Sequence, residues 1–299
     1  MDTKKWQSIG TVLGETNIDH FYFSLKNYKA KKGDIITTES KIPSSEGNVI
    51  PVTVWGKISS IESSNAFFPT EAAQELTNEN IDTTAAGRTD AGVHALGQII
   101  HFDTDLKRPM NSWVKGINSF LPHSIRIKWA HEVSPDFHAR FSAKGREYQY
   151  LLLNQSINSA IMSHYCGWSF YNLNLDLIKK SLLKFKGKHD FNAFRSSECQ
   201  ARSSVRTISK ISVKQHKNYF LFTFVADAFL QHQVRNMMGT IIKVGYGSID
   251  ADHIDYLFLQ NDRRLVPATF SPNGLYLTNI RYDSKWGLPK SNNKISINT

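Results

Sequence analysis

The chain has 299 residues, of which 40% are hydrophobic and 12% aromatic, and its formal net charge is +10. These values are typical of a folded protein with a substantial buried core, and they exclude a disordered chain. Cys166 and Cys199 form no Cys-x-x-Cys pair, the first residues do not resemble a signal peptide, and the apolar runs are short. We therefore expect a cytoplasmic protein without a membrane span.

The positive charge lies in the second part of the chain. Residues 1–82 contain 8 lysines, 11 acidic residues and no arginine, whereas residues 83–299 contain 28 basic and 15 acidic residues. Arginine is the preferred donor to phosphate, so the second part is expected to bind a polyanion. An ordinary soluble basic surface is the alternative. The change in composition predicts two domains, 1–82 and 83–299.

Residues 1–82 are predicted to form short strands near 9–13, 21–25, 34–38 and 49–58, followed by a helix near 70–76 with Thr70 as its cap. Closely spaced short strands predict a small β-barrel. Residues 8–82 resemble the HAS-barrel of HerA-type DNA-translocating ATPases. The resemblance rests on an Ile-Gly-x-Val-Leu-Gly-Glu motif near the start of this segment and a Phe-Phe-Pro-x-Glu motif near its end. No Gly-x-x-x-x-Gly-Lys-Ser/Thr loop is present in the chain, so this segment is assigned no chemistry.

Residues 83–299 alternate between strand and helix patterns, which predicts an α+β fold. The predicted strands cover residues 98–102, 125–130, 147–153, 208–213, 219–226 and 274–277, and the predicted helices cover 113–121, 175–186 and 229–242. Tyr148 and Tyr150 are expected on one face of their strand.

The segment Gly87-Arg88-Thr89-Asp90-Ala91-Gly92 is predicted to be a tight loop in front of the strand at 98–102. A loop that ends in a strand is a rigid support for a reactive side chain, and Asp90 lies at its tip beside Arg88. The alternative is that Asp90 only closes a turn by bonding its own backbone.

Other chemistries have little support in the sequence. The histidines and cysteines lack the spacing of a metal site, and neither a Gly-x-Ser-x-Gly elbow nor a Gly-rich nucleotide loop is present. An aspartate on a loop, several arginines and a tyrosine remain as the groups that could carry a reaction.

Seven ordered motifs resemble the tRNA pseudouridine synthase A family over about residues 84–287. They are Gly87-Arg88-Thr89-Asp90-Ala91-Gly92-Val93-His94-Ala95, Phe137-His138-Ala139-Arg140-Phe141-Ser142-Ala143, Arg146-x-Tyr148-x-Tyr150, Asp190-Phe191-x-x-Phe194-Arg195, Cys199-Gln200-x-Arg202, Phe229-x-x-His232-x-Val234-Arg235-Asn236 and Gly274-Leu275-Tyr276-Leu277.

The resemblance implies a pseudouridine synthase fold, with antiparallel sheets, flanking helices and two ferredoxin-like halves. Residues 83–140 would form an N-terminal subdomain and residues 141–299 a C-terminal one. The N-terminal subdomain is expected to be incomplete, because the family's opening strand and helix are not recognised before the loop. The implied activity is the isomerisation of uridine to pseudouridine at tRNA positions 38–40 by a homodimer, without metal or cofactor.

The resemblance also implies roles for four residues. Asp90 would be the nucleophile, attacking the flipped uridine at the sugar or at the base. Arg235 would pair with its carboxylate, Tyr148 would stack under the base and relay the proton that leaves C5, and Arg88 would hold the RNA backbone. His94 and His232 are interpreted as structural or RNA-contacting residues. Two alternatives remain: a non-catalytic tRNA-binding protein, and an adaptor whose residues 1–82 dock on a DNA-processing ATPase.

Overall fold

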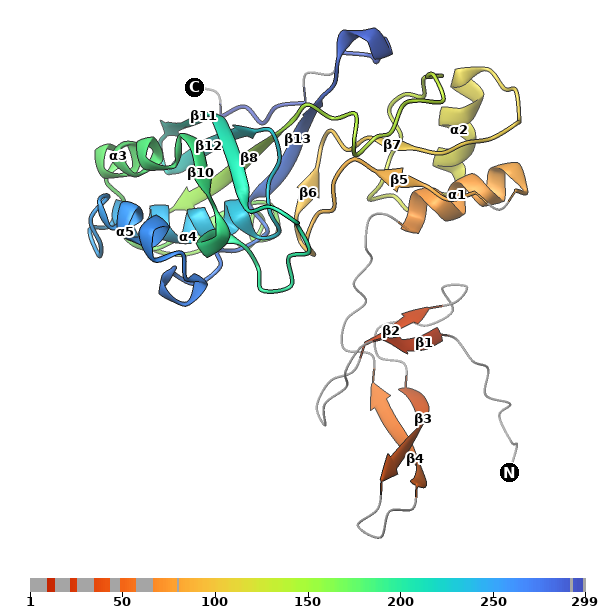
Figure 1. Ribbon diagram of the computed structural model, residues 1–299, viewed down its shortest axis with the longest axis horizontal. Helices are drawn as coiled ribbons and strands as arrows, with labels where there is room; N and C mark the ends of the chain where they lie inside the picture. Colours follow the sequence, from red (N-terminus) through yellow and green to blue (C-terminus); the bar gives the residue numbers. More distant parts are fainter. Residues whose placement is uncertain are drawn as a thin grey trace. The chain divides into compact units, whose positions relative to one another are not determined.

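The computed structural model describes residues 10–13, 22–25, 35–43, 49–57, 67–79, 81–290 and 293–297 (Figure 1). The chain divides into a first unit, residues 1–63, and a second unit, residues 64–299. In the first unit, β1 (Gly10–Leu13) pairs antiparallel with β2 (Tyr22–Leu25), and β3 (Ile35–Pro43) pairs antiparallel with β4 (Val49–Lys57). The four strands predicted from the sequence are therefore present, and their closure into a HAS-barrel stays a prediction.

The first helix belongs to the second unit, so the division falls at residue 63 and not at the expected residue 82. Helix α1 (Phe67–Thr77) packs against α2 (Met110–Phe120), and the two share an apolar cluster. The helices approach closely at Gly116, where an added Cβ would lie 2.6 Å from a methyl carbon of Leu76. The second unit therefore contains a helix before the Asp90 loop, separated from it by β5 (Thr84–Ala85), whereas the sequence predicted no helix of the catalytic region there.

The second unit is built on a seven-stranded sheet. Its strand order is β10 (Gly187–Asp190), β11 (Val205–His216), β12 (Tyr219–Ala226), β8 (Gly145–Asn154), β13 (Leu275–Arg281) and β6 (His94–Ala95), with β9 (Gly167–Ser169) also paired to β8. The pairs are antiparallel except β6 with β13 and β9 with β8, which are parallel. A separate two-stranded sheet joins β5 (Thr84–Ala85) to β7 (Ile100–His101).

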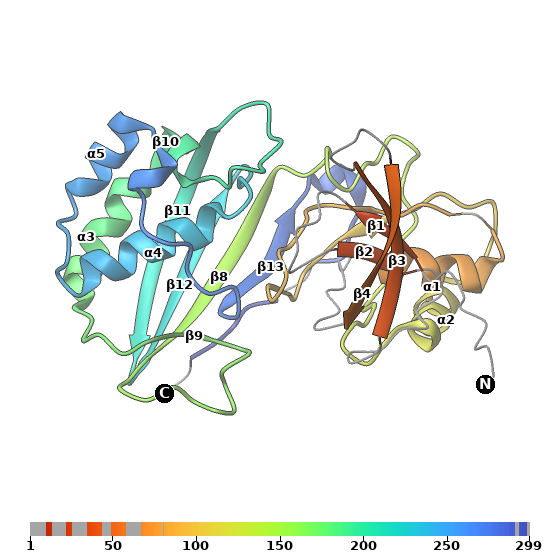
Figure 2. The same ribbon diagram turned by 90° about the horizontal axis from the view of Figure 1, so that it is seen from below.

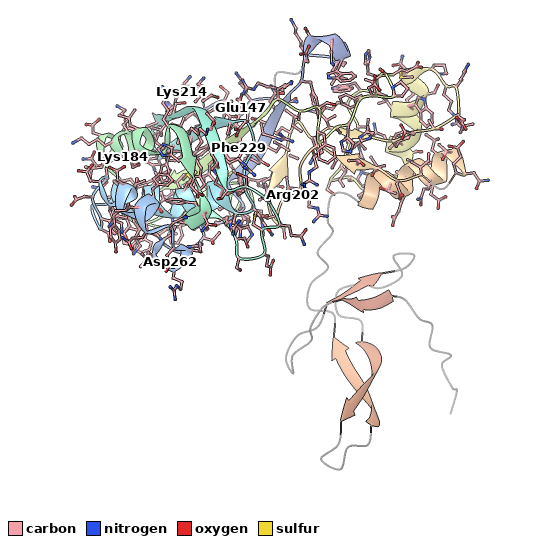
Figure 3. The ribbon with its side chains drawn as sticks, in the orientation of Figure 1. Glu147, Lys184, Arg202, Lys214, Phe229 and Asp262 are labelled. Carbon is pink, nitrogen blue, oxygen red and sulfur yellow. The ribbon has the colours of Figure 1, made fainter. Side chains whose placement is uncertain are left out.

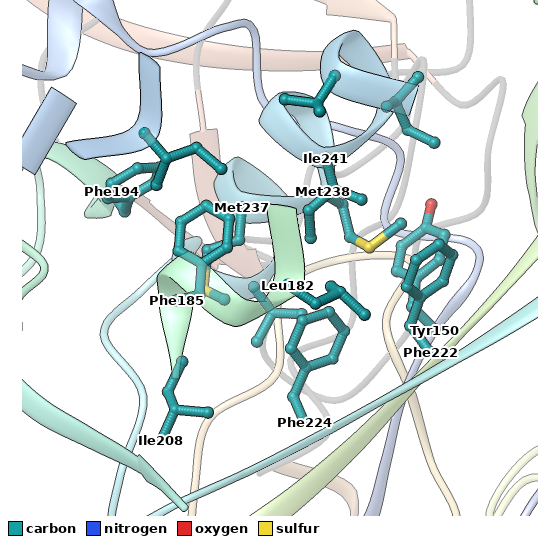
Figure 4. Close-up of a cluster of buried hydrophobic side chains, with 14 of the residues drawn as sticks. Tyr150, Leu182, Phe185, Phe194, Ile208, Phe222, Phe224, Met237, Met238 and Ile241 are labelled. Atoms are coloured by element: carbon teal, nitrogen blue, oxygen red, sulfur yellow. The ribbon is translucent and has the colours of Figure 1, made fainter. Parts of the chain in front are cut away.

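Three helices cover one face of the large sheet: α3 (Leu175–Phe185), α4 (Gln233–Gly245) and α5 (His253–Gln260) (Figure 2). Alternation along β8 directs Tyr148, Tyr150 and Leu152 towards these helices and Leu151 and Leu153 towards the opposite face. Tyr148 and Tyr150 thus share one face, as predicted. The main core lies between the sheet and the helices and is rich in aromatic and methionine side chains (Figure 4). This core fixes α4 relative to β8.

Three predictions differ from the structure. Helix α1 begins at Phe67, so Thr70 lies inside the helix and is not its N-terminal cap. Residues 125–130 form no strand, because both backbone groups of Ile127 bond to the side chain of Asn118 and not to a neighbouring strand. The helix predicted from residue 229 begins at Gln233, because His232 has a left-handed backbone with φ of 62°. A left-handed residue cannot continue an α-helix, so it sets the start of α4.

Candidate active site

The Asp90 loop is held at both ends by backbone hydrogen bonds. Ala86 N donates to the carbonyl oxygen of Ile99 at 2.8 Å, and Val93 N donates to the carbonyl oxygen of Asp90 at 3.0 Å. Between them, the Gln98 side chain donates to the carbonyl oxygen of Gly87 at 2.6 Å. The turn after Asp90 is thus closed by its backbone carbonyl, which leaves the carboxylate available for other partners.

Gly92 lets this loop approach the segment before β13. Its φ is +79°, a conformation that side chains disfavour, and an added Cβ would lie only 2.9 Å from Cγ of Pro272. Both constraints require glycine. The neighbouring Val93 is buried in the main core, so the loop is joined to the rest of the second unit.

The Asp90 carboxylate lies close to two basic side chains at the start of α4, His232 just before the helix and Arg235 within it. Arg235 Nη1 donates to Asp90 Oδ2 at 2.8 Å, and His232 Nε2 lies 3.4 Å from the same oxygen. The Asp90 and Arg235 side chains are 22% and 14% exposed, so water screens the pair only partly. The second distance exceeds the usual hydrogen-bond range, so His232 is an electrostatic neighbour that is charged only when protonated.

Tyr148 lies on β8 beside this pair. Its ring is half-buried and contacts Phe229 edge to face, with the ring centroids 5.2 Å apart. Desolvation, together with the nearby charge of Asp90, raises the pKa of Tyr148 to about 12. The phenol is therefore protonated at neutral pH, as a hydrogen-bond donor must be.

The comparisons with known proteins agree on one family. The family model described as tRNA pseudouridine synthase matches residues 18–142 and 182–283. The tRNA pseudouridine synthase A of Methylobacillus flagellatus is 46% identical over 226 residues, which cover 76% of this chain and 87% of that protein. The corresponding proteins of Nitrosomonas eutropha and Dechloromonas aromatica are each 45% identical over 221 residues, covering 74% of this chain and 80% and 84% of theirs.

The chain belongs to the tRNA pseudouridine synthase family. It is therefore an enzyme of the isomerase class, and the mixed α and β architecture of the second unit is consistent with a pseudouridine synthase fold. The family match begins at residue 18, well before the start expected at residue 84.

Of the four residues selected from the sequence, the synthase fold brings Asp90, Arg235 and Tyr148 together. The contacts that show this are the Arg235–Asp90 ion pair and the electrostatic effect of Asp90 on Tyr148. Arg88 lies in the same loop, two residues before Asp90, with an exposed side chain. The sequence did not predict His232 beside the carboxylate, because the left-handed backbone that places it just before α4 is not recognisable from residue types alone.

Arg146 is a further residue of the site to which the sequence assigned no role. Its guanidinium donates to the carbonyl oxygens of Ala86, Arg140 and Asp227 at 3.0–3.1 Å. Desolvation lowers its pKa, and Arg146 acts electrostatically on Tyr148, two residues along β8. Arg146 therefore ties the start of the Asp90 loop to the sheet.

The described residues include no group of three histidine, cysteine or acidic side chains that could hold a metal ion. They also include no helix that is both long and apolar enough to cross a membrane.

Proposed function

We propose that this chain isomerises uridine to pseudouridine at positions 38–40 of the tRNA anticodon stem-loop, with Asp90 as the nucleophile. The observation that carries the proposal is the Arg235–Asp90 ion pair, which joins residues 145 positions apart in a half-buried site beside Tyr148. Family membership supplies the reaction class, and the geometry supports the assignment of residues.

The isomerisation is balanced without an oxidant, a reductant or a second substrate. The bond from uracil N1 to ribose C1′ breaks, a bond from C5 to C1′ forms, C5 loses its proton, and N1 gains one. A nucleophile that attaches transiently to the sugar or to the base divides this change into easier steps. Asp90 can act at either atom, and both routes release the hydrogen of C5.

Arg235 stabilises the ionised form of the proposed nucleophile in a half-buried site. A carboxylate loses hydration energy on burial, and a guanidinium at hydrogen-bond distance offsets part of that loss. Arginine cannot lose its proton at neutral pH, so the compensation persists throughout the reaction.

Tyr148 and Arg88 are assigned to the substrate. An enzyme that acts on a base within a duplex or a stacked loop must flip the nucleotide out, and flipped bases stack on aromatic rings. The half-buried ring of Tyr148 can provide that surface, and the exposed Arg88 can hold the RNA backbone. Since the phenol of Tyr148 is protonated at neutral pH, it can pass on the C5 proton only while it releases its own.

Homodimeric assembly and a cytoplasmic location are part of the same proposal. The family resemblance supports the first, and two unpaired cysteines together with a tRNA substrate support the second.

The experiment that tests the proposal measures tritium released from tRNA labelled at uridine C5. The intact chain should release tritium, and Asp90→Asn should lower the rate by more than about a thousandfold while keeping tRNA affinity, because an amide cannot act as the nucleophile. Full release by Asp90→Asn would refute the nucleophile assignment. Salt-sensitive tRNA binding with no release by the intact chain would favour the non-catalytic alternative.

A further inference from the structure

We propose that Arg263 is a positioning residue that orients Arg235 towards Asp90 by holding residues 266–270 against α4. The inference rests on the proposed role of the Arg235–Asp90 pair. It concerns a side chain that touches neither Asp90 nor Tyr148.

Arg263 organises the segment that follows the 3₁₀ helix η2 (Arg263–Leu265). Its Nη1 donates to the carbonyl oxygens of Val266 at 2.8 Å and Pro267 at 3.2 Å. Its Nη2 donates to Asn236 Oδ1 and to Thr269 Oγ1, both at 3.1 Å. One guanidinium therefore joins two backbone carbonyls, a hydroxyl and a side chain of α4.

Asn236 connects this network to the core. It is fully buried, and its Nδ2 donates to the carbonyl oxygen of Phe194 at 2.7 Å. Its Oδ1 accepts from Arg263 and also from Thr269 Oγ1, the latter at 2.7 Å. Since Asn236 directly follows Arg235, the network is attached to α4 beside the residue that pairs with Asp90.

The segment also approaches α4 too closely for any side chain at Gly239. An added Cβ there would lie 2.3 Å from the carbonyl oxygen of Ala268. The helix and the segment are therefore in direct contact through their backbones, independently of the Arg263 hydrogen bonds.

The segment ends at Phe270, which holds Arg235. Arg235 Nε donates to the carbonyl oxygen of Phe270 at 2.9 Å, and Phe270 N donates to the carbonyl oxygen of Arg235 at 3.2 Å. With Nε fixed in this way, the planar guanidinium presents Nη1 to Asp90 Oδ2 at 2.8 Å. The position of the Phe270 carbonyl thus sets the direction of the ion pair.

Only arginine supplies this combination of contacts. Lysine has a single nitrogen with three donors on a flexible stem and cannot serve all four acceptors. Partial burial lowers the pKa of Arg263. The four partners of its guanidinium are carbonyl, amide and hydroxyl oxygens, and none of these four is a carboxylate. A half-buried cation of this kind is expected where its hydrogen bonds fix a backbone.

The test uses Arg263→Met in the full chain, with Arg264→Met as the matched control. Arg264 is 88% exposed at its side chain and pairs with Asp262, which Figure 3 labels at the margin of the second unit. Arg263→Met should lower the single-turnover rate of tritium release about 10- to 100-fold, because a misdirected catalytic group loses such factors. The affinity for tRNA should change less than about twofold, and Arg264→Met should match the wild-type rate.

A double-mutant cycle with Arg235→Lys separates positioning from general damage. If Arg263 acts through Arg235, adding Arg263→Met to the Arg235→Lys variant should lower the rate of tritium release by less than about threefold, because Arg235 is already altered there. If Arg263→Met lowered the rate by the same factor in the wild type and in Arg235→Lys, the inference would be overturned. A folded Arg263→Met protein with an unchanged rate would also overturn it. Should Arg263→Met fail to fold, Thr269→Val replaces it in the same cycle, with an expected loss of about 3- to 10-fold.

A second readout does not depend on catalysis. The Nε proton of Arg235, identified in ¹⁵N spectra by its loss in Arg235→Lys, should exchange slowly in the wild type and at least about tenfold faster in Arg263→Met. Unchanged exchange in a folded variant would refute the positioning role. Full activity of Asp90→Asn would instead refute the proposed nucleophile and leave this readout valid.

Discussion

At the residue scale, two tyrosines on the same face of β8 have different surroundings. Tyr150 is fully buried and donates to the carbonyl oxygen of Ser271 at 2.8 Å, so its hydroxyl already has a structural hydrogen bond. Tyr148 is half-buried, contacts Phe229 and lies within the electrostatic reach of Asp90. Only Tyr148 combines a ring that a base could stack on with a hydroxyl close to the proposed nucleophile.

For Tyr148→Phe, we expect tRNA affinity within about twofold of the wild type and a rate of tritium release lowered about 10²- to 10⁴-fold. The ring that stacks is retained, whereas the group that would relay the C5 proton is removed. Filter binding and single-turnover release measure the two quantities. Tyr150→Phe, which alters a hydroxyl already bonded to Ser271, is the control and should release tritium normally. A normal rate for Tyr148→Phe would limit the role of Tyr148 to stacking.

At the element scale, the segment 125–130 has no strand partner, and one side chain of α2 bonds both backbone groups of its Ile127. Asn118 on α2 donates to the carbonyl oxygen of Ile127 at 2.9 Å and accepts from Ile127 N at 2.8 Å. These two bonds replace the ladder of a β-strand for residues 125–130. Ile125 and Ile127 also pack on the cluster shared by α1 and α2, so the segment closes one side of that cluster.

Asn118→Ala should lower the free energy of unfolding by about 1–2 kcal/mol, because both backbone groups of Ile127 lose their protein partner. Urea unfolding followed by circular dichroism measures this change. Ser119→Ala is the matched control, since Ser119 is exposed and bonds only within its own helix to Gly116. Equal stabilities for the two variants would show that Asn118 does not hold the segment.

At the scale of the whole molecule, burial of tyrosine hydroxyls makes stability depend on alkaline pH. Desolvation raises the pKa of Tyr148 and of Tyr276 to about 12, and it also raises the pKa of Tyr150 and Tyr282. In the unfolded chain these groups ionise near pH 10, their ordinary value. Between about pH 10 and pH 12 the unfolded state has lost tyrosine protons that the folded state retains, so the free energy of unfolding falls as pH rises.

We expect the urea midpoint to be steady near pH 9 and to fall steeply between about pH 10 and 12. Each of the two tyrosines with a pKa of about 12 contributes a loss on the order of 2 kcal/mol over that window. Tyr276→Phe should show a shallower decline, although it starts less stable because the hydrogen bond to the Tyr165 carbonyl is lost. The same slope in the wild type and in Tyr276→Phe would contradict this account.

Local patterns in the sequence determined much of the secondary structure and the tight loop around Asp90. Alternation placed β8 with Tyr148 and Tyr150 on one face, and helical spacing predicted α3 at Leu175–Phe185. The glycines and the Thr-Asp pair predicted a tight loop around Asp90, and the ordered motifs that resemble the family proposed it as the active-site loop. These features depend on neighbouring residues, so the sequence alone is sufficient to indicate them.

Tertiary structure decided which distant groups meet. The contact of Asp90 with His232, the network of Arg263 and the attachment of α1 to α2 join residues far apart in the chain. No spacing in the sequence encodes such distances, because they arise when the sheet and helices bury a common core. The left-handed backbone at His232 likewise makes α4 begin at Gln233 and not at the predicted residue 229. Asp90 and its partner Arg235 could be proposed from the sequence, whereas the network of Arg263 that holds Arg235 could be found only in the folded chain.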